Sequence, residues 1–205
     1  MNNDEPEPRA STKIIGITGG IGSGKSTVSQ YIEEAGFPVY SSDLRAKEIV
    51  NESADLRIRI SELLGPDAYN HLGVYDRKYV AERIFSDEEQ LLQLNGLIHP
   101  AVRRDFESWV IRQETPFVFK ETALLFELKL NESCYKSVLV TADDNCRLKR
   151  VMDRDEKTYR EVEAVMLKQM PEKDKIKLAD YIIYNNGTLE DLRTETMRFL
   201  EVLTS

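Results

Sequence analysis

Hydrophobic residues fall into two kinds of segment along this chain of 205 residues. Short runs rich in β-branched and aromatic residues alternate with longer stretches whose apolar residues recur every three or four positions, the spacing of an amphipathic helix. Such alternation predicts a parallel β-sheet with helices on both faces. The runs that we predict to be strands are Ile14 to Thr18, Pro38 to Tyr40, Phe117 to Thr122, Ser137 to Thr141 and Tyr181 to Tyr184.

The longest interval between predicted strands runs from residue 44 to residue 115 and contains several helical stretches. A crossover between parallel strands needs only a dozen or more residues, usually one helix. We therefore expect residues 44–115 to be a helical insertion that binds the substrate, within one α/β domain over residues 13–205.

Capping and breaking residues predict where the helices of this insertion begin and end. A Gly-Pro pair ends a helix, Asp and Ser cap helix starts, and proline suits a first helical turn. We expect one helix to end at Gly65-Pro66, one to run from Arg77 to Phe85 after a cap at Asp76, one to follow Ser86 or Asp87, and one to run from Pro100 toward Gln113.

The composition is that of a soluble globular protein, with 41% hydrophobic and 31% charged residues. No apolar run approaches the roughly 20 residues that cross a bilayer. Residues 1–12 are polar, include Pro6 and Pro8 and lack the apolar middle of a signal peptide, so we expect a disordered lead-in there. These features predict a cytoplasmic protein that binds no membrane.

Charge and metal-ligating residues narrow the possible partners further. The formal net charge of -8 argues against a nucleic-acid-binding face, which needs a cationic surface. Cys134 and Cys146 do not form a C-x-x-C pair, and we expect both to be reduced packing residues. Since His71 and His99 are the only histidines, a zinc site lacks ligands, and Mg2+ is the metal that we expect.

Residues 19–26 read G-G-I-G-S-G-K-S and fit the phosphate-loop pattern G-x-x-x-x-G-K-[ST]. They follow a predicted strand and precede an amphipathic run that begins at Thr27, which is the setting that the motif requires. The glycines let the backbone curl so that successive N–H groups face phosphate oxygens, and the following helix adds its positive end. This setting favours a nucleoside triphosphate site over a glycine-rich turn that binds nothing.

The chemistry of such a loop assigns a role to its charged and hydroxyl side chains. Lys25 can reach the β- and γ-phosphates, and the Ser26 hydroxyl can hold Mg2+. The residues that we expect to bind the nucleotide are Gly20, Ile21, Gly22, Ser23, Gly24, Lys25, Ser26 and Thr27.

Residues 147–160 carry six Lys or Arg residues among three acids, a local excess of positive charge in an acidic protein. One interpretation is a solvated helix face with pairs of opposite charge. The other is a lid whose guanidinium groups close over the triphosphate and neutralise charge in the transition state. We select Arg150 and Arg154 for the lid, since i,i+4 spacing puts them on one helix face.

A kinase also needs a carboxylate near the phosphates to take the proton of the acceptor hydroxyl. Asp43 follows a predicted strand, where open α/β folds bind their ligands, and could instead cap a helix over residues 44–51. Glu121 ends another predicted strand and could hold the water shell of Mg2+ or the acceptor. The alternative for Glu121 is an ordinary exposed strand end.

The sequence resembles dephospho-CoA kinases over about residues 13–203. The extended phosphate-loop form is more specific than the general pattern, and further blocks follow in the order and approximate spacing of that family. The matching segments are T-G-G-I-G-S-G-K-S-T-V at 18–28, Asp43, Asp76-Arg77, His99-Pro100, L-L-F-E at 124–127, Ala179-Asp180 and Asn185-Asn186-Gly187.

This resemblance implies a P-loop kinase core with a parallel sheet, a helical insertion that binds CoA, and a lid at about residues 147–160. The implied reaction transfers phosphate from ATP to the ribose 3'-hydroxyl of 3'-dephospho-CoA, giving CoA and ADP, with Asp43 matching the proposed proton acceptor. Arg77 matches an arginine that could meet the substrate's phosphates, unless it forms a surface salt bridge.

Two more blocks gain a role from the resemblance. His99 matches the histidine of the H-P block, and this match implies that it binds the substrate. The alternative is a residue at the start of a helix whose side chain is hydrogen-bonded to backbone groups. Asn186-Gly187 resembles the loop that passes the adenine of ATP, the alternative being a plain left-handed turn.

The chain departs from the family pattern at two places. Ser41-Ser42-Asp43 keeps only the last acid of a common D-A-D, which puts any duty of the first carboxylate in doubt. Ala123 replaces a common proline before L-L-F-E, and Glu121 stands where aspartate is frequent. These two changes should alter backbone stiffness more than chemistry.

Three other functions compete with this interpretation. The nearest is another small-molecule kinase on the same fold, which fold alone would not distinguish. A GTPase switch would carry N-K-x-D, but no K-x-D tripeptide occurs in the chain. A nucleic-acid-dependent ATPase fits poorly with the net charge.

Overall fold

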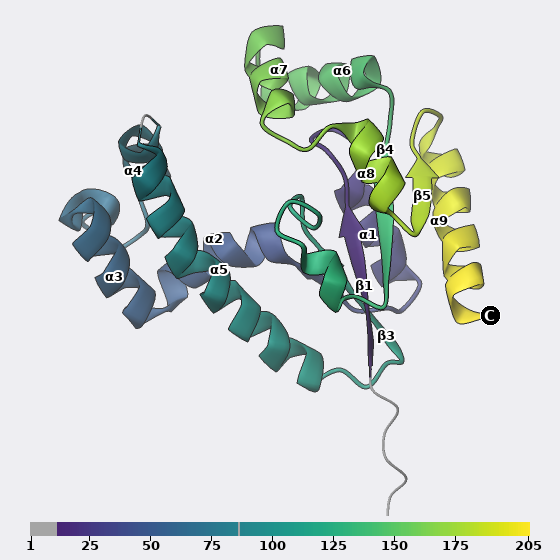
Figure 1. Cartoon of the computed structure of the whole chain (residues 1–205), viewed down its shortest axis with the longest axis horizontal. Coiled ribbons are helices and arrows are strands. Elements are labelled where there is room, and N and C mark those ends of the chain that lie inside the picture. The colour runs from purple at the N-terminus through teal and green to yellow at the C-terminus, as the bar shows by residue number, and fades with distance from the viewer. Residues whose placement is uncertain (1–11, 86) are drawn as a thin grey trace, which may run out of the picture. The chain divides into compact units, whose positions relative to one another are not determined.

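A computed structural model describes residues 12–85 and 87–205 and contains one five-stranded sheet (Figure 1). The strands lie in the order β2-β3-β1-β4-β5, with β1 parallel to β3 and β4, and β4 parallel to β5. The five predicted strands are confirmed to within one residue at either end. They are β1 (Lys13–Thr18), β2 (Val39–Ser41), β3 (Phe117–Glu121), β4 (Lys136–Thr141) and β5 (Tyr181–Tyr184).

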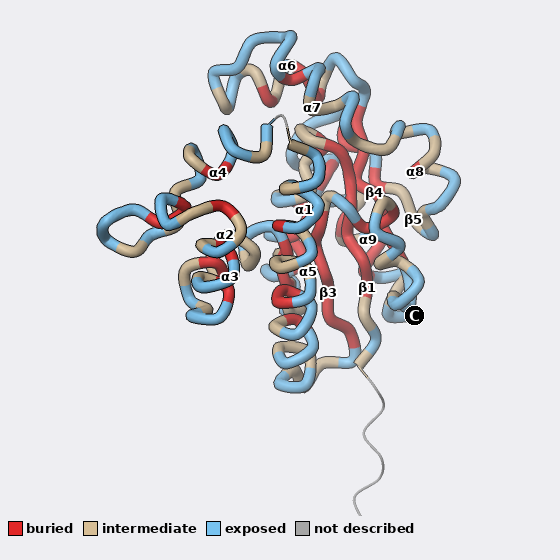
Figure 2. Tube along the Cα trace, turned by 60° about the vertical axis from the view of Figure 1, so that its left-hand side comes forward, coloured by how far each residue is buried: buried red, intermediate tan, exposed pale blue. Residues whose placement is uncertain are grey.

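Burial of the sheet on both faces explains why these strands read as nearly continuous apolar runs. Figure 2 shows β1, β3 and β4 as largely buried. One face packs against α1 (Lys25–Glu34) and α9 (Leu189–Thr204), which lie beside each other. The core that they share with alternate strand residues includes Ile15, Ile17, Val28, Ile32, Phe119, Val138, Val140, Leu192 and Phe199.

Three helices follow β4 in the same part of the chain: α6 (Asp144–Asp155), α7 (Tyr159–Leu167) and α8 (Glu172–Leu178). α6 packs against α7, and α8 packs against β4. A short 3-10 helix, η2 (Leu130–Ser133), precedes β4. The predicted lid over residues 147–160 thus comprises most of α6, a short link and the start of α7.

Residues 41–112 form a compact unit of their own, made of helices. Its helices are α2 (Ser42–Glu52), α3 (Ala54–Leu64), α4 (Arg77–Ile84) and α5 (Glu88–Ile111), with the 3-10 turn η1 (Pro66–Ala68). Their apolar faces share a core that includes Val50, Leu56, Ile60, Leu64, Val80 and Leu94. The boundaries lie three residues before those expected from the sequence, at 41 and 112 instead of 44 and 115.

One arginine fixes the helix that carries Asp43. Arg45 of α2 binds Asp105 of α5 at 3.0 Å and also pairs with Glu48 and Glu52 on its own helix. The hydrogen bonds that Arg45 donates to these carboxylates, first of all to Asp105, raise the pKa of Arg45 above its usual value. Three carboxylates on one guanidinium hold α2 in a fixed direction against α5.

The structure confirms several of the predicted helix ends. α3 ends at Leu64 with Gly65 as its C-cap, and the Asp76 carboxylate accepts hydrogen bonds from Lys78 N and Tyr79 N at the start of α4. Asp87 caps α5 through Gln90 N. The alternative cap Ser86 and the predicted lead-in up to residue 11 lie outside the described residues. Among the described helices, none is both long enough and apolar enough to cross a bilayer.

The predicted helix start at Pro100 is wrong, because Pro100 lies inside the 24-residue helix α5. Proline in a helix interior costs about 3 kcal/mol through a lost hydrogen bond and a clash with the preceding turn. Leu94, Leu97 and Ala101 lie on one face of α5 and join one core on both sides of the proline. Burying apolar side chains contributes about 1.5–3 kcal/mol each for the larger ones, which outweighs the cost.

Replacing this proline should stabilise the helical unit. Pro100 is exposed, so Pro100→Ala removes no core contact and restores the backbone hydrogen bond. We expect the free energy of unfolding to rise by about 1–2 kcal/mol, since the helical gain of about 3 kcal/mol is partly offset by a more flexible unfolded chain.

Urea denaturation measures this change, and Pro66→Ala is the matched control. Pro66 is also exposed but stands at the first position of η1, where it removes no interior hydrogen bond. The control should therefore show no gain. A loss of stability in Pro100→Ala would mean that α5 requires its proline.

Candidate functional site

The loop between β1 and α1 turns sharply toward the helix. Ser23 N donates to Gly20 O at 3.2 Å, and Gly22 and Gly24 have φ values of 77° and 99°. Such positive φ angles strain residues that carry a Cβ. Gly24 is the N-cap residue of α1, so the loop leads directly into the positive end of that helix.

A side chain at the end of β5 holds this loop in place. Asn185 is 6% exposed, and its Nδ2 donates to Ser23 O at 2.8 Å. A Cβ built on Gly24 would overlap Asn185 Nδ2. Position 24 therefore requires glycine for two reasons. Its φ is positive, and Asn185 fills the space that a side chain would need.

Lys25 and Ser26 lie in the first turn of α1, where backbone N–H groups have no acceptor within the helix. The Lys25 ammonium group donates to Gly19 O at 2.9 Å, which folds the side chain over the loop. Ser26 is exposed. Backbone N–H groups, a cation and an exposed hydroxyl thus meet at one helix end, which is an anion-binding arrangement.

The two arginines predicted for the lid have different surroundings. Arg150 Nη2 donates to Asn185 Oδ1 at 3.4 Å, which brings it to the side chain that holds the loop. Arg154 pairs with its neighbour Asp155 at 2.6 Å, and its side chain is 62% exposed. The Arg154 hydrogen bond lowers the pKa of Asp155. Arg154 has the surroundings of a surface ion pair, whereas Arg150 reaches the loop region.

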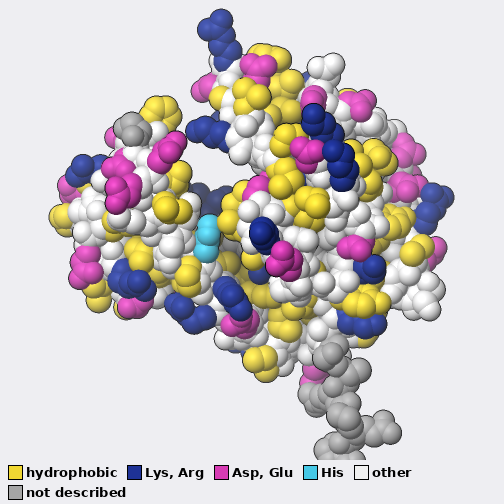
Figure 3. Space-filling model, in the orientation of Figure 1, with side chains coloured by type: hydrophobic (Ala, Val, Ile, Leu, Met, Phe, Trp, Pro, Cys, Tyr) yellow, Lys and Arg dark blue, Asp and Glu magenta, His cyan; other side chains and the backbone are white. Residues whose placement is uncertain are grey.

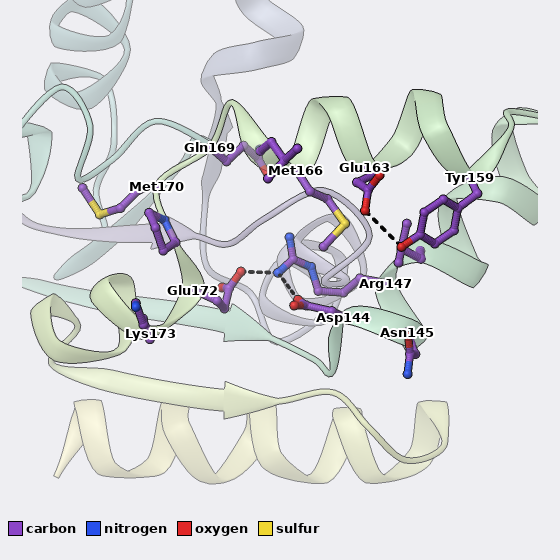
Figure 4. Close-up of a pocket in the computed structure, with 13 residues that line it drawn as sticks. Asp144, Asn145, Arg147, Tyr159, Glu163, Met166, Gln169, Met170, Glu172 and Lys173 are labelled. Carbon is purple, nitrogen blue, oxygen red and sulfur yellow. Dashed lines mark hydrogen bonds and ion pairs between the residues drawn. The ribbon is translucent and has the colours of Figure 1, made fainter.

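Sequence reasoning missed two residues that contact the loop directly. Arg147 of α6 is 3% exposed and donates from Nε to Ile21 O at 3.1 Å. Gln169 Oε1, from the link between α7 and α8, accepts from Ile21 N at 2.9 Å. Both line a pocket of about 500 Å³ that Figure 4 shows. Arg147 shares a helix face with Arg150 and Arg154, so face spacing alone could not rank the three.

Glu121 is not an exposed strand end, which corrects that alternative. It is 7% exposed at the end of β3 and pairs in register with Ile17 of β1. The carboxyl ends of β1 and β3 therefore meet beside the loop. A buried carboxylate at this edge of the sheet has the position that a ligand-binding group takes in open α/β folds.

Asn186-Gly187 is not a left-handed turn, because neither residue has a positive φ. Asn186 Oδ1 accepts from Asp143 N at 2.8 Å, and its Nδ2 donates to Asp143 Oδ1 at 3.1 Å. A Cβ on Gly187 would lie 2.5 Å from Asp191 Oδ2, part of the capping box of α9. This segment joins the ends of β4 and β5 and leads into α9.

Within residues 41–112, Asp43 is exposed in the first turn of α2. The alternative that Asp43 caps a helix starting at Leu44 is wrong, since α2 starts at Ser42 after Ser41. A carboxylate in the first turn of a helix interacts favourably with the positive end of the helix dipole.

Arg77 and His99 also belong to this helical unit. Arg77 is exposed at the start of α4, and no ion pair joins it to another described residue, so the surface salt bridge is not seen. His99 is half-buried in the middle of α5, which corrects the alternative of a helix-entry residue. Burial lowers the pKa of His99, so its imidazole is neutral at pH 7 and offers hydrogen bonds instead of a fixed charge.

Metal-ligating side chains are numerous in the chain but dispersed among the described residues. No three His, Cys, Asp or Glu residues gather there as a metal site. Both cysteines are free thiols, and burial raises the pKa of Cys134 to about 11, which makes it unreactive. Mg2+ in nucleotide sites is held largely by phosphate and water oxygens, so one protein hydroxyl such as that of Ser26 suffices.

Surface charge gives no single-sign face in the view of Figure 3. Acidic and basic side chains are interspersed on the face that this view shows. Lys25 and Arg147 donate hydrogen bonds to carbonyl groups of the phosphate loop, and Arg150 donates to Asn185, which holds the loop.

The family model and the curated relatives agree on one family. The family model for dephospho-CoA kinase matches residues 13–191. A dephospho-CoA kinase of Fusobacterium nucleatum is 37% identical over 193 residues, which cover 94% of this chain and 100% of that protein.

Solved structures agree with this match. The crystal structure of TT1252 from Thermus thermophilus has a TM-score of 0.84 and 38% identity, covering 95% of this chain and 99% of the other. Dephospho-CoA kinase from Campylobacter jejuni has a TM-score of 0.64 and 26% identity, covering 94% and 97%.

The close approach of Asn185 to Gly24 generates a prediction for nucleotide affinity. In Gly24→Ala, the new methyl group displaces Asn185 from Ser23 O and leaves a buried carbonyl unsatisfied. Because such a loss costs about 1–3 kcal/mol, we expect ATP to bind about 10- to 100-fold more weakly by isothermal titration calorimetry.

Gly36→Ala separates this contact from backbone strain. Gly36 has a φ of 91°, but a Cβ there meets nothing within 4 Å. It should lose stability to the same backbone strain while binding ATP normally. Equal ATP affinities in the two variants would remove Asn185 from the account.

Proposed function

The chain belongs to the dephospho-CoA kinase family, which phosphorylates the ribose 3'-hydroxyl of 3'-dephospho-CoA with ATP in the last step of coenzyme A biosynthesis, and we propose the residues that do this here. The observation that supports the proposal best is the loop at the start of α1, where Gly24 and Asn185 fix a backbone turned toward the helix end. Residues 20–27 bind the triphosphate through backbone N–H groups, and Lys25 contacts the β- and γ-phosphates. Asn186-Gly187 passes the adenine.

Mg2+ fits this loop through oxygen donors alone. The Ser26 hydroxyl in the first turn of α1 would hold the ion together with oxygens of the nucleotide phosphates. When bound, Mg2+ neutralises charge on the β- and γ-phosphates. Glu121, buried at the neighbouring strand end, would hold the water shell of the ion or the acceptor.

Asp43 acts as the general base. Its carboxylate accepts the proton of the 3'-hydroxyl while the 3'-oxygen forms a bond to the γ-phosphorus. The bond between the γ-phosphorus and the β,γ-bridging oxygen breaks, and ADP leaves with the electron pair. The Asp43 carboxylate is exposed in the first turn of α2, so a substrate hydroxyl can approach it.

The helical unit of residues 41–112 binds the CoA portion of the acceptor. Arg77, exposed and without an ion-pair partner among the described residues, contacts its phosphates. Neutral His99 offers a hydrogen bond from α5. The segment of residues 147–160 acts as a lid that excludes water, and Arg150 and Arg154 neutralise transferred charge.

Replacing the base tests this assignment. We expect Asp43→Asn to lower kcat about 100-fold or more, the usual scale for loss of a general base, with ATP binding nearly intact. Lys25→Ala should instead weaken ATP binding as well as turnover. Coupled ADP release measures the turnover of each variant, and isothermal titration calorimetry measures its ATP binding.

Asp55→Asn is the matched control for the base. Asp55 is likewise an exposed first-turn aspartate, on α3, so its replacement changes charge and helix dipole in the same way. It should leave kcat unchanged. A normal kcat in Asp43→Asn would deprive Asp43 of its catalytic role.

Arg150 and Arg154 differ enough to rank their contributions. Arg150→Ala should lower kcat for transfer by at least about 10-fold and raise the ratio of ATP hydrolysis to transfer, since a cation on the phosphates is lost and water enters. Arg154→Ala should have a smaller effect, because Arg154 is paired with Asp155.

Lys149→Ala, at an exposed position of the same helix, is the control for lost surface charge. The rates of ADP release without and with dephospho-CoA give the ratio of ATP hydrolysis to phosphoryl transfer. An unchanged ratio in Arg150→Ala would contradict a water-excluding role.

A further inference from the structure

Ile21, in the middle of the phosphate loop, is held at three points by the segment from α6 to α8. Its N–H donates to Gln169 Oε1 at 2.9 Å, and its carbonyl accepts from Arg147 Nε at 3.1 Å. Its side chain packs against the cluster of Leu148, Val151 and Val162. The partners of this one loop residue thus come from a single distant segment of the chain.

The hydrogen bond from Arg147 fixes the direction of one peptide group in the loop. Gly20 to Ser23 form a four-residue turn, and the Gly22 φ of 77° is that of a type II turn. Types I and II differ in the orientation of the central peptide, which here joins Ile21 and Gly22. Because a trans peptide is planar, the Gly22 N–H points opposite to the Ile21 carbonyl. Because Arg147 binds the Ile21 carbonyl, the Gly22 N–H points away from the Arg147 side chain.

Arg147 is itself firmly held. Its Nη1 pairs with Glu172 and, at 3.3 Å, with Asp144, as Figure 4 shows. It is 3% exposed, and a Cβ on Gly20 would overlap its Nη2. A buried guanidinium with three fixed acceptors is pre-organised, so little freedom is left to rotate away from Ile21.

The residues around Gln169 are anchored to the turn segment that follows β3. The next residue, Met170, donates from its N–H to Glu127 Oε1 at 3.2 Å. The fully buried Lys175 of α8 pairs with the same oxygen at 3.3 Å. Glu127 therefore fixes the link that presents Gln169 to the loop.

We propose that Arg147, supported by Gln169, is a positioning residue for phosphoryl transfer that holds the Ile21–Gly22 peptide with its N–H toward the phosphates. This inference rests on the proposed binding of ATP by residues 20–27. A flipped peptide would turn a carbonyl oxygen, the negative end of the dipole, toward the phosphates. A pre-aimed N–H stabilises charge that develops in the transition state without reorganisation.

The test replaces Arg147 without leaving its partner charged and unpaired. In Arg147→Met/Glu172→Gln, a side chain of similar length loses the hydrogen bond to Ile21. We expect kcat to fall about 10- to 100-fold, while KM for dephospho-CoA changes less than about 3-fold. This decrease in kcat is smaller than that for deleting a transition-state hydrogen-bond donor, because the Gly22 N–H is still present and only loses its fixed direction. Arg198→Met/Glu195→Gln makes the same exchange in an exposed pair on α9 and should change neither.

An amide resonance gives a readout that a purely structural role would not move. On titration with ADP, the Gly22 and Gly24 N–H signals of the wild-type protein should both shift. In the double variant the Gly24 signal should still shift and the Gly22 signal should not. A wild-type kcat, or a Gly22 response like that of the wild type, would overturn the proposal.

Two further variants keep the test decisive. Arg147→Lys keeps a charge for Glu172 but lacks the guanidinium fork, whose Nε and Nη1 bind Ile21 O and Glu172 separately. Its kcat should therefore fall similarly if the double variant does not fold. Lys25→Ala reports on the site itself. If Lys25→Ala retains wild-type kcat, the proposed ATP site fails; if only the Arg147 variants do, the positioning role fails alone.

Discussion

The backbone turn between β1 and α1 is the constraint on which the rest of the site depends. It needs glycine at positions 22 and 24, because both have positive φ and because neighbouring groups fill the space of a side chain. Asn185 from the end of β5 and Arg147 from α6 occupy that space and hydrogen-bond the loop carbonyls. The strand order brings these distant residues to the carboxyl end of the central strand, so the sheet topology makes the loop rigid.

In the proposed mechanism, the chemistry is divided between two units of different construction. The proposed nucleotide side is built on a parallel sheet, where strand ends and a helix N-terminus supply fixed backbone dipoles. The proposed acceptor side is a set of helices whose side chains, Asp43, Arg77 and His99, are exposed or half-buried. An enzyme with this division can keep one phosphate site while acceptor specificity depends on the helical unit.

Periodicity predicted the strands well, since buried parallel strands are short, apolar and flanked by helical spacing. The prediction of a helix start at Pro100 was wrong, because the shared core of Leu94, Leu97 and Ala101 outweighs the local helix-breaking effect of proline. Charge spacing could not single out Arg147, because its partner Ile21 lies 126 residues away. Asn185 was within reach of prediction: it directly follows the last strand, and the carboxyl ends of parallel strands meet at one edge. The cytoplasmic location and the lack of a nucleic-acid partner stay predictions.

The most direct test of the account is the release of ADP from ATP and Mg2+ with a panel of acceptors, combined with the mass of each product. The panel contains 3'-dephospho-CoA, nucleoside monophosphates, adenosine and gluconate. We expect strong stimulation by dephospho-CoA alone and a product heavier by one phosphate. Stimulation by a different acceptor, or by none, would contradict the assignment of the substrate while leaving the phosphate loop to another kinase reaction.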